Sequence, residues 1–381
     1  MSFSAELETA AAQVRDSVRA ALENGTPLRV AAAGGWLDAG RPVGAADRLS
    51  PGPAGIVEYV PGDLTITARA GTPLRDIAQL TAPHNQWLPL DPFGSPNMTI
   101  GATVATASAG PLAHAFGTPR DQVIGLGFVT GRGDYVRSGG RVVKNVAGFD
   151  LTRLLIGSWG TLGVITDATL RLRARPEAER TIALIVSADS VKFRETLAAV
   201  MEAQIAPLAL ELLNGVAARA VGADDDDTLL LVRLGGNRAV VAAQRELFGR
   251  LGEIRDAEPT VWDRLRQAEP AGAATVRVSG PLIEFGSLWL RLQRELGPAA
   301  PFMHGTPARG VVRCAVPYES AGLLSAIGTD GDQATRIFER LPADAWARVP
   351  ATAASSLSHR VREAFDPAML LNPGILGHQV S

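Results

Sequence analysis

Three glycines stand three residues apart in the stretch "GSWGTLGVIT", and apolar, β-branched residues follow them. A chain keeps glycine, at an entropic cost, where the backbone takes a left-handed turn or comes very close to another group. Gly157, Gly160 and Gly163 therefore predict that the backbone edge of residues 163–166, which includes Val164 and Ile165, lies against a flat group. Its N–H and C=O groups would then be exposed for base-like hydrogen bonds. The alternative interpretation is an ordinary connection between a helix and a strand.

Two other stretches carry almost no large side chains. "AAAGGW" (31–36) follows a short strand pattern, and "GATVATASAG" (101–110) consists almost entirely of Gly, Ala, Ser and Thr. Small side chains let backbone N–H groups approach a ligand, and the start of a helix offers unpaired N–H groups and a positive dipole end to an anion. Taken singly, the first stretch also fits an ordinary loop, and the second fits a helix packed closely on a sheet.

Together, the three stretches predict a site for a long cofactor that contains phosphate. The sequence has no G-x-x-x-x-G-K-[ST] pattern, which excludes a P-loop. The G-x-G within 125–131 lies in a strand pattern with no helix after it, whereas a Rossmann motif requires a strand, a turn and a helix in that order. The expected cofactor site is therefore of another type.

Charge and cysteine content narrow the class of protein. The formal net charge of −2 argues against nucleic acid or an anionic membrane as a partner. The lone cysteine, Cys314, excludes an intrachain disulfide, a cysteine-based zinc site and an iron–sulfur cluster carried by this chain alone. The sequence shows neither a signal-peptide pattern nor an apolar run of about 18–20 residues. It therefore predicts a cytoplasmic protein that would reach the inner membrane only through a partner.

Hydrophobic patterning predicts the elements that position these stretches. Apolar residues recur at helical spacing over 7–22, and a hairpin is expected at 121–140. Asp150 is expected to cap a short helix that Gly157 ends. After about residue 177, strands alternate with longer helices. The pattern predicts an α+β protein in two parts.

Taken in order, the stretches resemble the vanillyl-alcohol-oxidase, or PCMH-type, FAD-binding family. "AAAGGW" takes the place of the family's first pyrophosphate loop, and "TIGATVATASAG" is similar to its second. "GSWGTLGVIT" is similar to its G-S-x-G-x-L-G-x-I-T, and "FDPAMLLNPGIL" to its D-P-x-x-x-x-N-P-G. The resemblance covers 28–176 and 366–376. Within the family, "VVKNVAGFDLTRLLIGSWGTLGVIT" most resembles the smaller FAD-binding (E-type) subunits of bacterial glycolate oxidase.

The resemblance implies an α+β fold: a two-subdomain PCMH-type FAD-binding domain over 1–177 and a smaller α+β cap over 178–350. Residues 351–381 would return to the first domain. The implied cofactor is FAD, bound non-covalently because the first loop lacks the histidine that other members attach to flavin. The residues expected to bind FAD are Ala33, Gly34, Gly35, Trp36, Leu37, Thr99, Gly101, Ala102, Thr103, Thr106, Ala107, Gly110, Lys144, Gly157, Gly160, Gly163, Val164, Ile165 and Asn372.

Two features bear on how the flavin would be held. Lys144 lies in "VVKNVAGFD", which the resemblance places near the flavin, and a cation there would stabilise the reduced anion. The alternative role for Lys144 is a surface ion pair. Ala102 replaces the second glycine of T-I-G-G, and Ala107 with Ser108 stands where Asn-Ala is common. These departures keep a second hypothesis open, in which the chain has lost its flavin.

The candidate catalytic residue is His304. Oxidation of a 2-hydroxy acid requires a base for the hydroxyl proton. Relatives that oxidise D-2-hydroxy acids carry H-x-G-D-G-N-x-H and E-H-G, which hold a metal and supply that base. Here "MHGTPARGVVRC" keeps only the first histidine, Arg313 stands near the place of the second, and no E-H-G precedes the C-terminal helix. The alternative role for His304 is structural, and no metal site is predicted.

The resemblance implies a subunit of a glycolate oxidase-like complex, with a larger FAD (D-type) subunit and an iron–sulfur (F-type) subunit as partners. The complex would oxidise a small 2-hydroxy acid, glycolate or D-lactate, to the 2-oxo acid. Because the cap lacks the usual ligands, this chain's flavin is expected to relay electrons or support assembly. The alternatives are a free-standing FAD-dependent oxidoreductase with its own base and a structural subunit without flavin.

Overall fold

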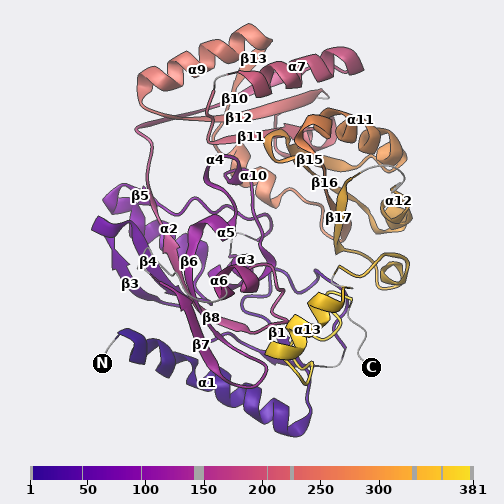
Figure 1. The fold of residues 1–381 in the computed structure, drawn as a ribbon. Helices are drawn as coiled ribbons and strands as arrows, with labels where there is room; N and C mark the ends of the chain where they lie inside the picture. The colour runs from indigo at the N-terminus through magenta and orange to yellow at the C-terminus, as the bar shows by residue number, and fades with distance from the viewer. Residues whose placement is uncertain are drawn as a thin grey trace. The chain divides into compact units, whose positions relative to one another are not determined.

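The computed structural model describes residues 3–44, 46–95, 97–140, 150–203, 205–223, 227–327, 333–352 and 355–377. The chain forms two compact units (Figure 1). Unit 1 comprises Met1–Ala109, Gly117–Arg175 and Pro350–Ser381, and unit 2 comprises Gly110–Phe116 and Pro176–Val349. The sequence does not predict the assignment of Gly110–Phe116 to unit 2, because its composition continues that of the preceding stretch.

Unit 1 contains a five-stranded antiparallel sheet in the order β3-β4-β8-β6-β7. Its strands are β3 (Ile56–Val60), β4 (Thr65–Arg69), β6 (Val123–Val129), β7 (Tyr135–Gly139) and β8 (Val164–Arg171). The central strand β8 is buried along nearly its whole length. Two small pairs complete the strands: β1 (Leu28–Val30) runs parallel to β2 (Asp47–Leu49), and β5 (Gln86–Trp87) antiparallel to β9 (Arg173–Ala174).

Helices cover both faces of this sheet. They are α1 (Phe3–Asn24), α2 (Leu74–Thr81), α3 (Ile100–Thr106), α5 (Pro119–Gln122), α6 (Leu151–Leu155) and α13 (Ser356–Phe365). The apolar stripe of α1 shares a core with Val164 of β8, and α3 shares another core with Ile165. Neighbouring residues of a strand point to opposite faces, so the two cores lie on either side of the sheet.

Unit 2 contains an eight-stranded antiparallel sheet in the order β13-β10-β12-β11-β15-β16-β14-β17. Its strands are β10 (Ala178–Val186), β11 (Ala209–Leu213), β12 (Thr228–Gly236), β13 (Ile254–Ala257), β14 (Ala273–Ser279), β15 (Phe302–Thr306), β16 (Val311–Pro317) and β17 (Thr335–Arg340). Its helices are α4 (Ala113–Phe116), α7 (Ser190–Glu202), α8 (Gly215–Ala220), α9 (Arg238–Leu251), α10 (Val261–Gln267), α11 (Phe285–Leu296) and α12 (Ala321–Ala326).

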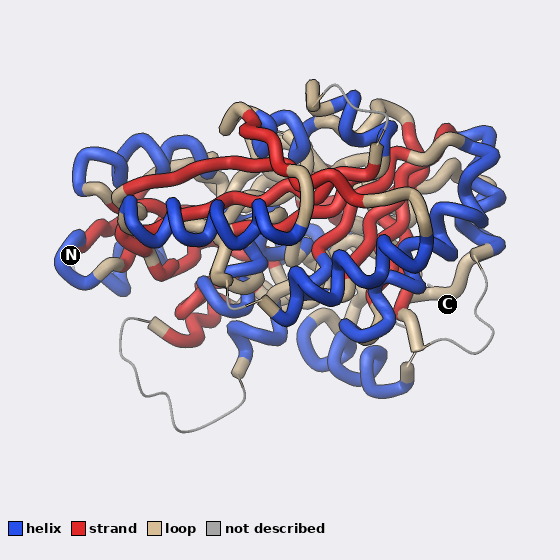
Figure 2. Tube along the Cα trace, turned by 90° about the horizontal axis from the view of Figure 1, so that it is seen from above, coloured by secondary structure: helices blue, strands red, loops and turns tan. Residues whose placement is uncertain are grey.

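The two faces of the unit 2 sheet differ in chemistry. Helices α7, α9, α11 and α12 bury their apolar sides on one face, against residues such as Leu212, Met303 and Cys314. Figure 2 shows blue helices lying against the red strands. Because side chains alternate along a strand, the neighbours of these residues point to the other face. That face carries Glu211, His304 and other polar residues.

The local predictions agree with these elements. The hairpin expected at 121–140 is β6 and β7, which confirms that the G-x-G within 125–131 belongs to a strand. Asp150 caps α6, and its side chain accepts the Arg153 N–H at 3.0 Å. Gly157 follows the end of α6 with a left-handed φ of 81°.

Candidate cofactor-binding site

A cavity of about 660 Å³, which includes space open to solvent, lies in unit 1. Its wall is formed by Arg29, Val30, Ala31, Ala32, Gly34, Gly35, Trp36, Leu37, Pro51, Gly101, Ala102, Ala105, Thr106, Trp159, Gly160, Gly163, Ile165, Asn372 and Ile375. The three side-chain-poor stretches therefore meet at one cavity.

The loop 31–37 follows β1 directly and forms one wall. Gly34 takes a left-handed φ of 84°, which glycine adopts without strain. The backbone N–H groups of Ala32, Ala33, Gly34 and Gly35 find no acceptor among the described residues. A row of such N–H groups forms a concavity that suits an anion. The first stretch thus offers the hydrogen-bond donors that a phosphate group needs.

The second stretch differs from the prediction. The Gly101 N–H donates to Ala70 O at 2.8 Å. The Ala102 N–H donates to the Thr99 side chain at 3.3 Å, and the Thr103 N–H donates to Thr99 O at 3.0 Å. The expectation that this helix start presents unpaired N–H groups to an anion is therefore wrong, because the protein itself supplies the acceptors.

Small residues in α3 serve packing instead. A Cβ on Gly101 would lie 2.7 Å from Ala70 Cβ, so only glycine lets α3 approach the end of β4 this closely. Ala102, Ala105 and Thr106 then line the cavity. The alternative interpretation of a helix packed closely on a sheet holds for Gly101.

In the third stretch, two glycines are required by conformation and one by packing. Gly157 and Gly160 have left-handed φ values of 81° and 68°. A Cβ on Gly160 would also lie 2.7 Å from Asn372 Nδ2. Gly163 lies outside the left-handed region, and its Cβ would lie 2.8 Å from Phe128 Cδ2. The close neighbours of Gly160 and Gly163 are therefore groups of the protein itself.

Residues of the third stretch nevertheless form part of the cavity wall. Strand β4 pairs with β8 only as far as Arg69 opposite Asp167. Beyond that point, Gly163 and Ile165 line the wall. Trp159 packs edge-on against Trp36 of the first loop, with ring centroids 5.9 Å apart.

Asn372 joins the first stretch to the third. Its Oδ1 accepts the Val30 N–H at 2.8 Å, and its Nδ2 donates to Trp159 O at 2.7 Å. Its own backbone N–H donates to Leu28 O at 2.8 Å. Because backbone groups engage both polar atoms of the side chain, Asn372 positions the wall of the cavity.

Asp366 and Arg362 fix the segment that carries Asn372. The Asp366 carboxylate accepts the backbone N–H groups of Leu370 at 3.0 Å and Leu371 at 2.9 Å. The Arg362 guanidinium donates to Leu371 O at 2.7 Å. Burial raises the pKa of Asp366, although the two N–H donors and Arg362 oppose the rise. In the D-P-x-x-x-x-N-P-G motif, Asp366 thus fixes the backbone that places Asn372 at the cavity wall.

The structure brings most of the predicted FAD contacts to the cavity wall. Those that line it are Gly34, Gly35, Trp36, Leu37, Gly101, Ala102, Thr106, Gly160, Gly163, Ile165 and Asn372. Those described in unit 1 but absent from the lining are Ala33, Thr99, Thr103, Ala107, Gly157 and Val164. Gly110 belongs to unit 2, and Lys144 lies outside the described residues.

The residues absent from the lining have other places in the fold. The Thr103 hydroxyl donates to Thr99 O at 2.9 Å at the start of α3, and Ala107 ends that helix with a φ of 50°. The Gly157 N–H donates into the same helix. Val164 points into the core beneath α1. Their contribution is to hold the walls in place.

Sequence reasoning missed lining residues outside the three stretches. Arg29 and Val30 immediately precede the first loop, and Ile375 follows Asn372 within the C-terminal motif. Proximity to a recognised motif could have indicated these three. Pro51 follows β2, and no sequence pattern marks it.

His304 lies in unit 2, on the polar face of the sheet. Its Nδ1 is 2.6 Å from Glu211 Oε1, and the Thr306 hydroxyl donates to Glu211 Oε2 at 2.8 Å. The side chains of His304 and Glu211 are each 2% exposed. The predicted catalytic histidine is thus held by a buried carboxylate.

A second polar cluster surrounds Arg313, which stands opposite His304 in the β15–β16 ladder. Arg313 pairs with Glu269 at 2.6 Å and with Glu339, and Arg340 pairs with Glu269 at 2.8 Å. Burial raises the pKa of Glu269, but Arg313 and Arg340 outweigh it and hold that pKa below its ordinary value. Burial lowers the pKa of Arg313, but the two carboxylates outweigh it and raise that pKa.

Two kinds of feature are absent from the described part of the chain. No three His, Cys, Asp or Glu side chains there form a group that could hold a metal ion. No helix there combines the length and the apolar character needed to span a bilayer.

Comparison with known proteins agrees with the sequence resemblance. The FAD binding domain family model matches residues 8–139. The chain is 35% identical over 256 residues to glycolate oxidase subunit GlcE of Escherichia coli, covering 67% of each chain. It is 37% identical over 160 residues to glycolate oxidase subunit GlcD of Bacillus subtilis, covering 42% of this chain and 34% of that protein. It is 38% identical over 160 residues to the mitochondrial D-lactate dehydrogenase [cytochrome] of Arabidopsis thaliana, with coverages of 42% and 28%.

Solved structures share the fold along nearly the whole chain. p-Cresol methylhydroxylase aligns with a TM-score of 0.75 and 16% identity, covering 97% of this chain and 87% of that one. An alkyldihydroxyacetonephosphate synthase aligns with a TM-score of 0.68 and 15% identity, covering 94% and 75%. At these identities the likeness concerns the fold alone, and it confirms the predicted PCMH-type architecture.

Two observations show that the cavity fits FAD. Unpaired backbone N–H groups line the first loop, and the single charged side chain in the wall is a cation. Both suit the negatively charged diphosphate of a dinucleotide. The cofactor is FAD, and the protein is an FAD-dependent oxidoreductase, as the sequence predicts. The chain belongs to the family of FAD-binding oxidoreductase subunits that includes glycolate oxidase subunit GlcE.

Proposed function

We propose that this chain is the FAD-binding subunit of a glycolate oxidase-type complex. The complex oxidises a small 2-hydroxy acid, glycolate or D-lactate, to the corresponding 2-oxo acid. One observation carries the proposal: the three stretches that resemble those of an FAD-binding domain meet at one cavity, in a chain similar to GlcE over two-thirds of its length. When bound, FAD would supply a redox group that takes up electrons and passes them on.

The FAD is held without a covalent bond. No lining residue of the described cavity is a histidine, cysteine or tyrosine, so the wall offers no side chain of the kinds that attach to flavin. Binding then rests on the N–H groups of the loop 31–37, the packing of Trp36 and Trp159, and the clamp made by Asn372. FAD should therefore leave the protein when it unfolds.

The partners are a larger, D-type FAD subunit and an iron–sulfur, F-type subunit. The single cysteine, Cys314, is buried in β16, and burial raises the pKa of its thiol. One buried thiol cannot ligate a cluster. Electrons that leave this chain's flavin then need another carrier, and a relay or assembly role suits the chain.

A second candidate function is oxidation of the hydroxy acid by this chain alone. The buried pair of His304 and Glu211 favours it. A carboxylate on Nδ1 fixes the imidazole tautomer and orientation, which leaves Nε2 as the nitrogen able to accept a proton. That arrangement suits a general base for the substrate hydroxyl. The same pair also suits a purely structural role in the sheet.

Turnover measurements separate the two candidates. The FAD-loaded chain is assayed alone, and then with the D-type and F-type subunits, using glycolate or D-lactate and an artificial electron acceptor. The proposal predicts turnover by the complex and none above background by the chain alone. Robust turnover by the isolated chain would overturn the proposal and favour the second candidate.

The His304→Gln variant sharpens this test. If the chain acts as a relay or assembly subunit, the complex that contains this variant keeps its turnover rate and its pH profile. If His304 is the base, the variant loses turnover by about 10²–10⁴-fold. Glu211→Gln serves as the matched variant, because it weakens the hold on Nδ1 while leaving the imidazole in place.

A further inference from the structure

Arg29 is the one charged residue in the wall of the described cavity. It lies in the middle of β1, just before the loop 31–37. Its Nη2 donates to Leu37 O at 3.3 Å, at the far end of that loop. The guanidinium group therefore spans the segment whose N–H groups are unpaired.

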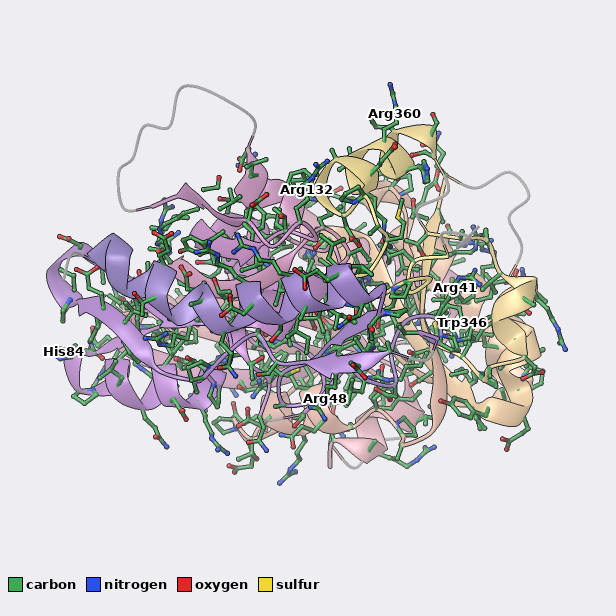
Figure 3. The ribbon with its side chains drawn as sticks, turned by 90° about the horizontal axis from the view of Figure 1, so that it is seen from below. Arg41, Arg48, His84, Arg132, Trp346 and Arg360 are labelled. Carbon is green, nitrogen blue, oxygen red and sulfur yellow. The ribbon has the colours of Figure 1, made fainter. Side chains whose placement is uncertain are left out.

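Arg29 lies beside a second arginine, and no carboxylate pairs with it in the part of the chain that the structure describes. Arg48 is its register partner in the parallel β1–β2 ladder, so both side chains leave the same face. Arg48, labelled in Figure 3, donates to Ala32 O at 2.7 Å. Among the described residues, both arginines bond only to backbone carbonyl groups. Burial lowers the pKa of Arg29, and no neighbouring carboxylate offsets this effect.

The two fully buried arginines among the described residues, unlike the half-buried Arg29, lie beside carboxylates. Arg313 is 6% exposed and contacts two carboxylates, and Arg362 is 1% exposed and lies 3.5 Å from that of Asp366. A half-buried cation with no counter-charge is unfavourable unless an anion approaches it. Its place in a cavity wall indicates that this anion is part of the ligand.

The start of helix α3 does not offer hydrogen-bond donors to an anion in this cavity. Its first N–H groups already donate to Ala70 and Thr99. The remaining lining side chains are uncharged. Recognition of a dianionic group in this cavity therefore falls to the first loop and to Arg29.

We propose that the Arg29 guanidinium binds the diphosphate of FAD, together with the N–H groups of the loop 31–37. The planar fork of arginine matches phosphate oxygens, and its hydrogen bonds to Leu37 and the phosphate can form together. Arg48 acts as a positioning residue that fixes the carbonyl group of Ala32 and turns the loop N–H groups toward the ligand. The inference rests on the proposed function, in which FAD binds in this cavity.

The test is calorimetric titration of the flavin-free full chain with FAD, repeated over a series of salt concentrations. Arg29→Met removes the charge, and Arg29→Lys keeps the charge without the planar fork. Arg360→Met is the matched control, because Arg360 is exposed on α13 of the same unit and points away from it in Figure 3. Thermal unfolding of each flavin-free variant checks that it folds.

We expect Arg29→Met to weaken FAD binding by about 10–100-fold, Arg29→Lys to weaken it less, and the control to leave it unchanged. Added salt should weaken binding to the wild type more than binding to Arg29→Met, because one ionic contact is missing in the variant. ADP, which carries the diphosphate without the flavin, should lose affinity for Arg29→Met by a similar factor.

Three results would count against Arg29 in distinguishable ways. Wild-type affinity in Arg29→Met would overturn the inference alone. Weaker binding with an unchanged salt dependence would also overturn it, because Arg29 would then act only by holding the loop. If Arg29→Met does not fold, wild-type affinity for FAD and ADP in Arg29→Gln, which also lacks the charge, would decide against it. A wild-type chain that binds no FAD would contradict the proposed function itself.

Discussion

The two units handle polar groups in opposite ways. In the cavity of unit 1, the polar atoms are mostly backbone groups, and the one charged lining residue has no carboxylate partner among the described residues. On the polar face of the unit 2 sheet, charged side chains are buried and neutralise one another, as Glu211 does for His304 and Glu269 for Arg313. Unsatisfied donors suit a ligand, whereas satisfied pairs suit a stable fold. The difference predicts which substitutions affect FAD binding and which affect stability.

The largest expected effect lies in unit 2. Arg313→Met leaves the buried carboxylates of Glu269 and Glu339 with weaker partners, Arg340 and Arg277. Breaking a buried pair in this way costs about 3–5 kcal/mol of unfolding free energy. Hydrogen exchange of the β14, β16 and β17 peptides, measured without FAD, should report the loss in unit 2.

Two variants control this experiment. Arg238→Met removes an arginine that is 87% exposed and should change the unfolding free energy by less than about 0.5 kcal/mol. Adding Glu339→Gln to Arg313→Met removes one of the buried carboxylate charges that has lost its arginine partner, so it should recover part of the stability. Equal exchange in Arg313→Met and wild type would show that the cluster is not a determinant of stability.

The next effect concerns the clamp in unit 1. Asn372→Ala removes both side-chain hydrogen bonds to Val30 and Trp159 and places alanine at a φ of 44°. We expect a loss of about 2–3 kcal/mol in unfolding free energy, with weaker FAD binding, because the first and third stretches are no longer tied together. Denaturant unfolding and FAD titration measure the two effects.

Asn372→Gly separates the side chain from the backbone strain. Glycine accepts the left-handed φ but cannot make the two hydrogen bonds. If the clamp matters for FAD, the glycine variant should bind FAD as weakly as the alanine variant while unfolding less readily. Restoration of FAD binding by glycine would mean that only the backbone conformation matters.

The smallest expected effect is a pH dependence in unit 2. The folded-state pKa of Glu269 lies below its ordinary value, so its contribution to stability is present above the unfolded-state pKa of about 4.3. That contribution is lost as the pH falls through the folded-state pKa. Unfolding free energy should therefore decrease more steeply with acidification in the wild type than in Glu269→Gln. Identical slopes in the two proteins would contradict the assignment.

The same contrast explains what the sequence could predict. The cavity is encoded by short contiguous stretches, so the glycine-rich stretches indicate a long cofactor that contains phosphate. Their resemblance to a known family, together with the Asn372 motif, implies both the fold and FAD. The reason for individual glycines cannot be predicted. Gly163, for example, is required because Phe128, which is far from it in the sequence, packs against it. The cluster around Arg313 could not be predicted, because Glu269 precedes β14 and Glu339 and Arg340 lie in β17. These segments come close to Arg313 of β16 only because β14 pairs with both β16 and β17.

The central claim is that the three side-chain-poor stretches of unit 1 form a non-covalent FAD site. The most direct test is to purify the chain, record its visible spectrum, denature it and separate small molecules from protein. We expect the native protein to show flavin absorption bands. After denaturation, the small-molecule fraction should contain intact FAD, equimolar with the chain. A folded chain that neither contains FAD nor takes it up on titration would contradict the account, and flavin that stays with the denatured protein would contradict its non-covalent form.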